Sequence, residues 1–558
     1  MKITLAIGSN ILQQKNIDEA QSRLRHLLPG IVFGEAVWTT PIGIQSDRFL
    51  NLLAYADTPL SLENLQEALK AIEREMGDSH ENHQQGHVII DLDVAEYDGR
   101  TVKEVIWSKG VQQSQKQVVS NIGKQAPNRS NKQTEIKNQT VSNTINMKKI
   151  LSFVFLLLCC SSVFAQQFDS YFTDATLRID YIFAGNSKQQ WIALDQLNRI
   201  PRWYGKRQHL AELPVEGNGQ ITVRDHRSGA IVYRNSFSTL FQEWLSYPEA
   251  ETTTRSFENV FLIPYPKDTV DVTVELKNNR REVTASMTHT VVPTDILIRH
   301  IGENSVTPYV TLQQARDTSH CIHIAFLAEG YKQEEMATFE ADCRTATEAL
   351  FAHEPFKSMR DRFNVVAVEA PSQESGTSEP GKGVWKDTPL RSHFDTFYSD
   401  RYLTTLHLKA LHDCLAGTPY EHIIVLVNTE NYGGGGILNS YNLAMAHHKA
   451  FKPVVVHEFG HSFAGLADEY AYEAEQIPMY PHDIEPWEPN ITTQVNFHNK
   501  WENLIGKEEG VGLYEGAGYS LKGVWRGCKD CRMRTNEHPV FCPVCQQALT
   551  RLINFYTE

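Results

Sequence analysis

The stretch that decides the fold of the longer half of this chain is Val454-Val-Val-His457-Glu458-Phe-Gly-His461, an apolar run that leads into His-Glu-x-x-His. Residues four apart lie on one face of a helix, with Cβ atoms roughly 5–6 Å apart, so His457 and His461 can bind one ion. Glu458 then lies beside the metal, where it can take a proton from a zinc-bound water. The motif therefore predicts a metallohydrolase.

A third zinc ligand is expected in the continuation Ser462-Phe-Ala-Gly465-Leu-Ala-Asp468-Glu469-Tyr470. On a straight helix Asp468 would lie about 10 Å further along the axis than His461, whereas a metal bond is roughly 2 Å long. The helix must therefore end near Gly465, because a glycine tolerates the left-handed conformation that turns the chain back. Asp468 is then the expected third ligand, and Glu469 is the alternative.

Length and composition limit the classes of protein that this chain can belong to. Its 558 residues are too many for one core and indicate about three or four domains. A formal net charge of −14 argues against nucleic acid as the main partner, because phosphate binding needs a basic face. The nine cysteines are unevenly placed, with none before Cys159 and four between Cys528 and Cys545, which suggests two compartments.

The segment 147–165 has the pattern of a secretory signal peptide in an unusual place. Met147 and two lysines form a basic start, an apolar run follows, and the segment ends on Val-Phe-Ala165. A buried core helix or strand is the alternative, but the basic flank and the small-residue end favour export. We expect cleavage after Ala165, and lipidation at Cys159 or Cys160 is the second option.

Residues 111–146 are rich in Gln, Asn, Ser, Lys and Thr and cannot bury enough apolar surface to become ordered. They are predicted to be a disordered linker or translated intergenic sequence. Our hypothesis is that two coding units are joined here, with Met147 as the natural start of the second. In an intact fusion, residues 150–165 would instead be a signal anchor in the membrane, with the chain before it cytoplasmic and the chain after it exported.

Residues 1–110 alternate strand-like and helix-like segments, which predicts an α+β domain. Asp91 and Asp93 alternate with apolar residues on an expected strand, so both carboxylates face the same side and can hold Mg²⁺ on a triphosphate. Two metal ions that bridge phosphate oxygens would offset charge as a pyrophosphoryl group moves to an alcohol.

Three motifs of this unit resemble the hydroxymethyldihydropterin pyrophosphokinase family of folate synthesis. In the family's order they are Ile7-Gly-Ser-Asn10, Phe49-Leu-Asn51 and Ile90-Asp-Leu-Asp-Val94. We therefore expect a ferredoxin-like α+β fold. The resemblance implies Mg²⁺ on Asp91 and Asp93, ATP as the donor, and a pterin that stacks on Phe49 and hydrogen-bonds to Asn51.

The loop between Gly77 and Asp91 departs from that family. The family usually carries arginines there that clamp the ATP phosphates, whereas the loop in this chain contains no arginine or lysine. Without a guanidinium fork, the bidentate grip on phosphate is lost. The alternative is therefore a degenerate or very slow member of the family.

The chain after the signal-like segment is expected to contain two further domains. Short alternating segments in residues 166–295 predict a β-sandwich that presents substrate or has a structural role. In residues 296–558, buried strands at 322–331 and 423–427 alternate with helical patterns, which predicts an α/β layer. The glycines at 433–436 are expected to form a turn or hairpin loop, or to lead into an edge strand that pairs with an extended peptide.

The zinc motif and its surroundings resemble the M64 family of metallopeptidases, the IgA-peptidase group, over about residues 168–558. Its members carry His-Glu-x-x-His-x-x-x-Gly-x-x-Asp-Glu-Tyr, whereas in metzincins the glycine and the third ligand each come one residue earlier. Shorter matching pieces are Glu329-Gly-Tyr331, Phe363-Asn-Val365, Pro371-Ser-x-x-Ser-Gly376 and Cys531-Arg-Met533-Arg. The resemblance implies a metzincin-like α/β zincin fold with the ligands and base named above. Met533 would lie beneath the zinc, unless it is a plain core residue.

Cys528, Cys531, Cys542 and Cys545 form two Cys-x-x-Cys pairs with the spacing of a zinc ribbon. In a cytosolic protein this pattern would indicate structural zinc. Behind a signal peptide, disulfides are the favoured interpretation and structural zinc is the alternative.

Three functional hypotheses follow. The first is an exported zinc endopeptidase, located in the periplasm, at the cell surface or outside the cell, that cleaves a protein or peptide. The second is a pteridine diphosphokinase in the N-terminal unit, which would use Mg²⁺, ATP and hydroxymethyl-dihydropterin in the cytoplasm. The third is a non-catalytic surface binding protein whose metal is structural.

Overall fold

The computed structural model describes residues 1–34, 36–39, 49–78, 88–98, 100–103, 168–471 and 479–558. The predicted linker 111–146 and the signal-like segment 147–165 therefore lie outside the described residues. The chain divides into two compact units, Met1–Asn143 and Thr144–Glu558, which are described separately below. Among the described residues, none of the helices has the length and apolar character needed to cross a membrane.

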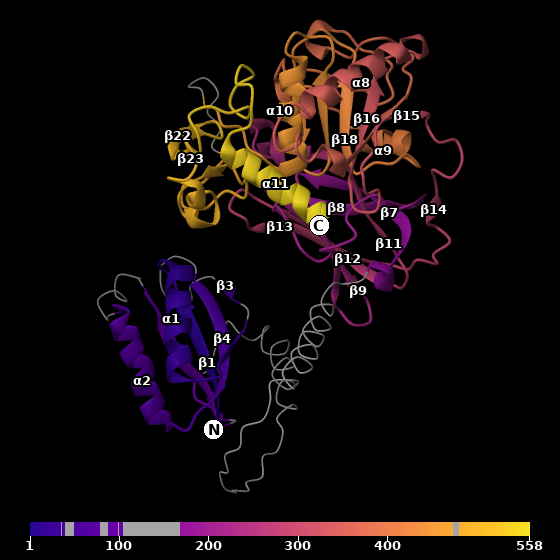
Figure 1. Cartoon of the computed structure of the whole chain (residues 1–558). Helices are drawn as coiled ribbons and strands as arrows, with labels where there is room; N and C mark the ends of the chain where they lie inside the picture. The colour runs from indigo at the N-terminus through magenta and orange to yellow at the C-terminus, as the bar shows by residue number, and fades with distance from the viewer. Residues whose placement is uncertain (35, 40–48, 79–87, 99, 104–167, 472–478) are drawn as a thin grey trace, which may run out of the picture. The chain divides into compact units, whose positions relative to one another are not determined.

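The N-terminal unit is an antiparallel sheet with two helices packed on one face (Figure 1). Its strand order is β2-β4-β1-β5-β6, and β3 also pairs with β4. Alternate residues of β1 and β5 are apolar and meet both helices in one core, so the polar residues between them lie on the opposite face. The elements are β1 (Lys2–Ser9), α1 (Gln13–Leu27), β2 (Val32–Phe33), β3 (Val37–Thr39), β4 (Phe49–Asp57), α2 (Leu62–Glu75), β5 (Asp91–Tyr97) and β6 (Arg100–Thr101). The predicted α+β class is confirmed.

The region after residue 167 begins with two four-stranded sheets, ordered β11-β7-β8-β14 and β10-β9-β12-β13. Aromatic rings from both sheets meet between them, and the Phe237 and Phe261 ring centroids are 4.2 Å apart. The elements are α6 (Phe168–Tyr171), β7 (Phe172–Gly185), β8 (Gln190–Pro201), β9 (Gly219–Asp225), β10 (Ile231–Phe237), α7 (Leu240–Trp244), β11 (Arg255–Pro266), β12 (Val270–Lys277), β13 (Val283–Val291) and β14 (Arg299–His300). The prediction of a β-rich middle region is confirmed.

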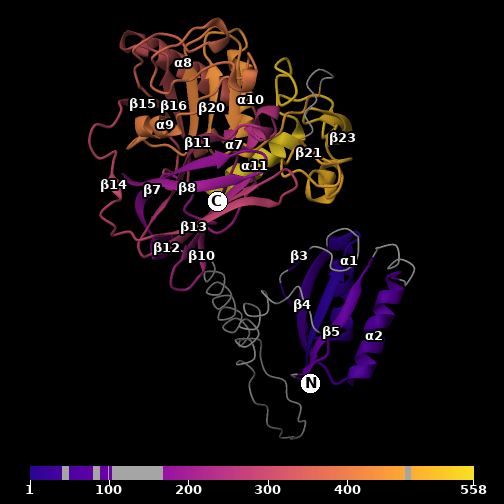
Figure 2. The same cartoon turned by 180° about the vertical axis from the view of Figure 1, so that it is seen from behind.

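A six-stranded sheet of order β15-β17-β16-β18-β20-β19 follows. Its four central strands are parallel, and the edge strands β15 and β19 are antiparallel to their neighbours. The strands are β15 (Tyr309–Gln313), β16 (Ile322–Glu329), β17 (Phe363–Val368), β18 (His422–Val427), β19 (Gly434–Ile437) and β20 (Tyr441–Met445). Helices α8 (Met336–Leu350) and α10 (Phe451–Ala464) lie side by side over this sheet, as Figures 1 and 2 show from opposite sides. The predicted mixed α/β layer is confirmed.

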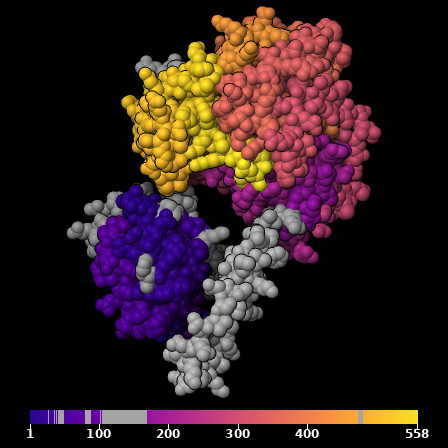
Figure 3. All heavy atoms as spheres, viewed as in Figure 1, coloured from indigo at the N-terminus to yellow at the C-terminus, as the bar shows by residue number. Residues whose placement is uncertain are grey.

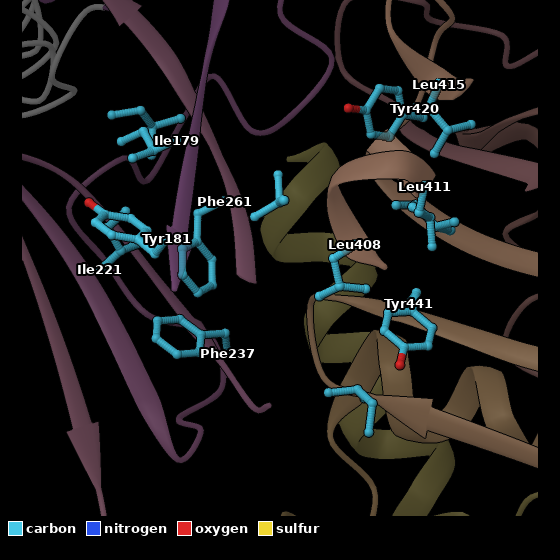
Figure 4. Packing of buried hydrophobic residues seen from close by; sticks show 14 of the residues in the cluster. Ile179, Tyr181, Ile221, Phe237, Phe261, Leu408, Leu411, Leu415, Tyr420 and Tyr441 are labelled. Carbon is cyan, nitrogen blue, oxygen red and sulfur yellow. The ribbon is translucent and has the colours of Figure 1, made fainter. Parts of the chain in front are cut away.

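The other face of this sheet packs on the two β-sheets of the middle region in one continuous core. Every residue of β16 and of β18 is buried, because these parallel strands are covered on both faces, and most of their residues are apolar. Helix α9 (Leu408–Leu415) contributes to the same core. Figure 4 shows two groups within it: Ile179, Tyr181, Ile221, Phe237 and Phe261 of the middle region, and Leu408, Leu411, Leu415, Tyr420 and Tyr441 of the α/β region.

A buried arginine of the middle region also contacts the α/β region. Arg178 of β7 donates to both carboxylate oxygens of Asp180, at 2.7 and 2.9 Å, and to Asp413 Oδ1 of α9 at 2.6 Å. Arg178 and Asp180 are each 1% exposed. The Arg178–Asp180 pair lies within β7, so the link to the α/β region is made by the contacts of the guanidinium with α9, namely Asp413 Oδ1 and the Lys409 carbonyl at 3.2 Å.

The C-terminal segment covers one side of the α/β region. It contains a small sheet of order β21-β23-β22, formed by β21 (Ile491–Thr492), β22 (Tyr514–Ala517) and β23 (Ser520–Arg526), and then helix α11 (Pro543–Thr557). Helix α11 contacts α10 and β16. In the space-filling view this segment, in yellow, lies directly against the orange residues of the α/β region (Figure 3).

Candidate functional site

Helix α10 carries the His-Glu-x-x-His motif and ends one residue before Gly465. Gly465 has φ of +60°, and its N–H donates to the His461 carbonyl at 2.9 Å. A Cβ there would lie 2.5 Å from the ring of Trp487, so the position requires glycine for space as well as for conformation. The predicted helix end near Gly465 is confirmed, and the chain turns back toward the histidines.

His457, His461 and Asp468 converge on one point. The two Nε2 atoms are 3.0 Å apart, and Asp468 Oδ1 lies 3.1 Å from His457 Nε2 and 3.4 Å from His461 Nε2. Tetrahedral bonds of about 2.0–2.1 Å place ligand atoms roughly 3.3 Å from one another. The three atoms therefore have the spacing of ligands around one metal ion.

Backbone carbonyls fix the orientation of both imidazoles. His457 Nδ1 lies 3.0 Å from the Arg532 oxygen, and His461 Nδ1 lies 2.5 Å from the Leu466 oxygen. A carbonyl only accepts, so each Nδ1 carries the proton and each Nε2 presents a lone pair. Two lone pairs and a carboxylate oxygen repel one another unless a cation or a proton lies among them. The donor set of this site therefore fits a divalent metal.

Asp468 is held from its other side. Its Oδ2 accepts from the Tyr519 hydroxyl, and its backbone oxygen accepts from the Gly518 N–H at 2.9 Å. The amide of Asn490 bonds both backbone groups of Ala467, at 2.7 and 2.9 Å. These contacts place one carboxylate oxygen toward the histidines and leave the other engaged with the protein.

Glu469, the alternative third ligand, lies elsewhere. Its Oε1 accepts from Asn490 Nδ2 at 2.9 Å and lies 3.1 Å from Cys545 Sγ. Of the two acidic candidates, Asp468 shares a group with the histidines, whereas Glu469 shares a group with cysteines.

The carboxylate of Glu458 lies against strand β19. A Cβ at Gly434 would lie 2.7 Å from Glu458 Oε1, and a Cβ at Gly436 would lie 2.5 Å from the Glu458 backbone oxygen and 2.9 Å from His461 Cβ. The turn or hairpin-loop interpretation of the glycine run was wrong, because Gly434–Ile437 is an edge strand. Glycine is needed in this strand so that α10 can approach it closely.

The outer side of β19 is partly occupied. The N–H of Gly434 donates to the Arg401 oxygen, and the N–H of Leu403 donates to the Gly434 oxygen, both at 3.4 Å. Gly436, two residues further on, directs its backbone groups to the same side.

Burial and charge shift the acidities of the site residues in the absence of a metal. Burial raises the pKa of Glu458, and the two histidines oppose that rise. Burial lowers the pKa of His461, but Asp468 and Glu458 outweigh it and raise that pKa to about 9. Burial raises the pKa of Asp468, but the histidines outweigh it and the pKa is lowered. The site therefore stabilises positive charge beside Asp468.

Met533 is fully buried against α10. Its Sδ lies 2.8 Å from where a Cβ of Gly460 would be, and its backbone oxygen accepts from the Glu469 N–H at 2.9 Å. The residue thus contacts the helix turn between the two histidines.

The four C-terminal cysteines are free thiols in this structure. Cys531 Sγ and Cys545 Sγ are 3.7 Å apart, whereas a disulfide bond is about 2.05 Å long. The favoured sequence interpretation, disulfides, is therefore not what the structure contains.

The N-terminal unit brings its own predicted residues together. Gly8 of β1 is paired in register with Asn51 of β4 on one side and with Asp91 of β5 on the other. A Cβ at Gly8 would lie 2.3 Å from Asn51 Oδ1 and 3.6 Å from Phe49, so glycine leaves room for both side chains. Asn51 Nδ2 also donates to Thr39 Oγ1 at 2.7 Å. Phe49, Asn51 and Asp91 therefore lie on one face of the sheet.

The two aspartates of β5 form a charged pair on that face. Burial, and then the nearby Asp93, raise the pKa of Asp91 to about 6. Lys103 pairs with Asp93, and Lys70 Nζ lies 3.8 Å from Asp91 Oδ1. A carboxylate whose ionisation is opposed by a neighbouring carboxylate is an arrangement that a divalent cation stabilises. Residues 79–87 of the loop that lacks arginines lie outside the described residues.

Family models match most of the chain. Residues 310–511 and 507–553 match the IgA peptidase M64 family, and residues 167–288 match the peptidase M64 N-terminus. Residues 4–143 match the 7,8-dihydro-6-hydroxymethylpterin-pyrophosphokinase family. The chain belongs to the M64 peptidase family and carries a pyrophosphokinase-family domain before it. Both are enzyme families. A search of curated proteins found no match to the chain.

Several contacts of the M64 region were not anticipated from the sequence. The Tyr519 hydroxyl, the Asn490 amide and the Arg532 carbonyl all support the group of His457, His461 and Asp468, from positions 23 to 75 residues away from their partners in the chain. A backbone carbonyl has no side-chain signature, and a single tyrosine or asparagine in a loop has no periodicity that would single it out.

We expect Asp468→Ala to lower the zinc content of the chain by one ion, because it removes one of three converging ligands. The matched control is Asp342→Asn, since Asp342 Oδ2 also lies 2.9 Å from a histidine, His447, outside the site. Elemental analysis after dialysis measures the zinc. Unchanged zinc in the Asp468→Ala chain would contradict the assignment.

Proposed function

We propose that residues 168–558 are a zinc-dependent endopeptidase that hydrolyses peptide bonds in a protein or peptide substrate. The observation that carries the proposal is the convergence of His457 Nε2, His461 Nε2 and Asp468 Oδ1 within 3.0–3.4 Å, next to the half-buried carboxylate of Glu458. Membership of the M64 family supports it. The antiparallel edge strand β19 beside helix α10 supports a metzincin-like zincin fold for the α/β region.

Zinc bound by the two histidines and Asp468 would polarise the scissile carbonyl and acidify the attacking water. Glu458 would take the proton of that water and later deliver it to the leaving amine. Burial raises the pKa of Glu458. This brings the pKa closer to the pH at which the enzyme would work, as an efficient general base requires. The glycines of β19 let α10 hold this carboxylate at the strand edge.

An extended peptide substrate would lie along β19. Gly436 directs its backbone groups to the outer side of the strand, and its missing side chain leaves Glu458 and His461 next to that edge. Gly434 already pairs with Arg401 and Leu403, so the segment 401–403 would mark one end of the substrate groove.

Replacement of Glu458 by Gln keeps the size of the side chain but removes the base, so we expect kcat on casein to fall by about 10²- to 10⁴-fold with zinc retained. Glu348→Gln is the matched control, because Glu348 is an exposed carboxylate on α8 that pairs with Arg360. Protease assay and elemental analysis of each chain give the two readouts. Casein cleavage at the wild-type rate by a zinc-loaded Glu458→Gln chain would reject the proposal, and absence of proteolysis in the wild type would favour a binding protein.

We also propose that the M64 region is exported through residues 147–165, while the pyrophosphokinase domain stays in the cytoplasm. The basic start, apolar run and small-residue end of that segment support export. Mass spectrometry of the mature M64 region should find its N-terminus at Gln166. A mature form that begins at Cys159 or Cys160 would indicate lipidation, and an intact chain of 558 residues in the cytoplasm would contradict export.

The second proposed activity is transfer of a pyrophosphoryl group from ATP to hydroxymethyl-dihydropterin by the N-terminal domain. The alignment of Asn51, Gly8 and Asp91 across three strands favours it, because it places pterin-binding and Mg²⁺-binding residues on one face. Asp91 and Asp93 would hold the Mg²⁺ of the nucleotide.

With Mg²⁺, ATP and hydroxymethyl-dihydropterin, the full chain should release AMP, and Asp91→Asn or Asp93→Asn should abolish the release because the metal ligands are lost. Asp57→Asn, an exposed aspartate at the end of β4, is the control and should leave the rate unchanged. Chromatographic detection of AMP measures the reaction. If no AMP is released at millimolar ATP, the domain is degenerate. The lack of arginines in the loop would explain that result.

A further inference from the structure

A second group of metal-ligating side chains is buried apart from the histidines. The sulfur atoms of Cys531, Cys542 and Cys545 and one carboxylate oxygen of Glu469 all lie within 4.8 Å of one another. None of the four residues is more than 3% exposed. None of them takes part in the proposed peptide hydrolysis.

The spacing of the sulfur atoms is that of ligands around one ion. Cys531 Sγ and Cys545 Sγ are 3.7 Å apart. Zinc–sulfur bonds of about 2.3 Å in tetrahedral geometry place two sulfur atoms roughly 3.8 Å apart, whereas a disulfide joins them at about 2.05 Å. The observed separation matches a shared metal.

Glu469 places Oε1 3.1 Å from Cys545 Sγ, and the protein leaves its other carboxylate oxygen unsatisfied. Its Oε1 accepts from Asn490 Nδ2, but its Oε2 is buried and has no hydrogen-bond partner among the described residues. A buried carboxylate oxygen without a partner costs free energy, and coordination to a cation would remove that cost.

Burial raises the pKa of the Cys531 and Cys545 thiols, and three features of the surroundings offset part of the cost of ionised sulfur. Cys542 occupies the N-cap of α11 and Cys545 lies in its first turn, where the helix dipole stabilises negative charge. The N–H of Cys542 donates to Cys531 Sγ at 3.2 Å. Two mostly buried guanidinium groups offset the remaining negative charge, because Arg526 acts on Glu469 and Arg532 acts on Cys531.

We propose that Cys531, Cys542, Cys545 and Glu469 bind a structural zinc ion. Sulfur ligands in a tetrahedral set select zinc among the common divalent ions, and four protein ligands leave no open position for catalysis. Cys528, whose thiol interacts with Cys542, is the competing fourth ligand.

This ion would fix the loop that orients the peptidase site. Arg532 and Met533 directly follow Cys531. The Arg532 oxygen faces His457 Nδ1 at 3.0 Å, and the Met533 oxygen accepts from the Glu469 N–H at 2.9 Å. The structural zinc site does not depend on the proposed proteolysis, because metal and thiol counts test it without any activity measurement.

The wild-type full chain provides the first test. We expect two zinc ions per chain, one released by p-hydroxymercuribenzoate, which attacks thiolates, and the other removed by 1,10-phenanthroline. A colorimetric zinc indicator follows both releases. After denaturation with a chelator, iodoacetamide should alkylate all three cysteines of the group. A single zinc ion per chain, together with disulfide-linked peptides that contain these cysteines, would overturn the proposal.

Variants then assign the ligands. Cys545→Ser should leave one zinc that only the chelator removes, whereas His461→Ala should leave one zinc that the mercurial releases. Cys343→Ala is the matched control, because this thiol on α8 is equally buried, and it should retain both ions. If Cys545→Ser does not fold, the mercurial release from the wild type decides the question.

The fourth ligand is tested separately. Loss of the mercurial-sensitive zinc in Glu469→Gln, with retention in Cys528→Ser, supports the assignment of Glu469. Loss in Cys528→Ser with retention in Glu469→Gln would overturn it in favour of a site of four cysteines.

Discussion

Two imidazole nitrogens and a carboxylate oxygen are held within 3.4 Å of one another, and the arrangement of several distant segments of the M64 region keeps them there. With both imidazoles neutral, these atoms repel one another, and a metal ion or a proton relieves the repulsion, which is why the pKa of His461 is raised to about 9 without a metal. Backbone carbonyls lock both rings of α10, and Tyr519 and Asn490 hold the segment that carries Asp468. A rigid scaffold of this kind preorganises a cation site before any cation binds.

The same constraint explains glycines that would otherwise weaken the elements in which they occur. Glycine lowers the stability of a strand and of a helix interior, yet Gly434 and Gly436 lie in β19 and Gly460 lies in α10. In each case a Cβ would come within 3 Å of Glu458, His461 or Met533. The chain accepts a weaker local propensity because the helix must approach both the edge strand and the buried methionine closely.

Elements with a strong local pattern were predictable from the sequence, and contacts between distant segments were not. Apolar periodicity predicts the buried strands and the two helices of the N-terminal domain. The distance that a third ligand must span predicts the helix end at Gly465. The sequence did not distinguish the strand at 434–437 from a loop, because glycines have no side chains that could show the alternation of apolar and polar residues typical of a strand. The roles of Tyr519 and of the Arg532 oxygen arise only when the C-terminal segment folds back on α10.

Two acidic pairs in the chain show how the backbone distributes carboxylates between sites. Asp91 and Asp93 are two residues apart on β5, so both face one side of the sheet and share one charged site. Asp468 and Glu469 are adjacent in a segment without helical structure, so their side chains leave the backbone in different directions. One reaches the histidines of α10 and the other reaches the cysteines at the start of α11. A single peptide unit therefore joins the two groups, and a shift of the loop that weakens one would also displace a ligand of the other.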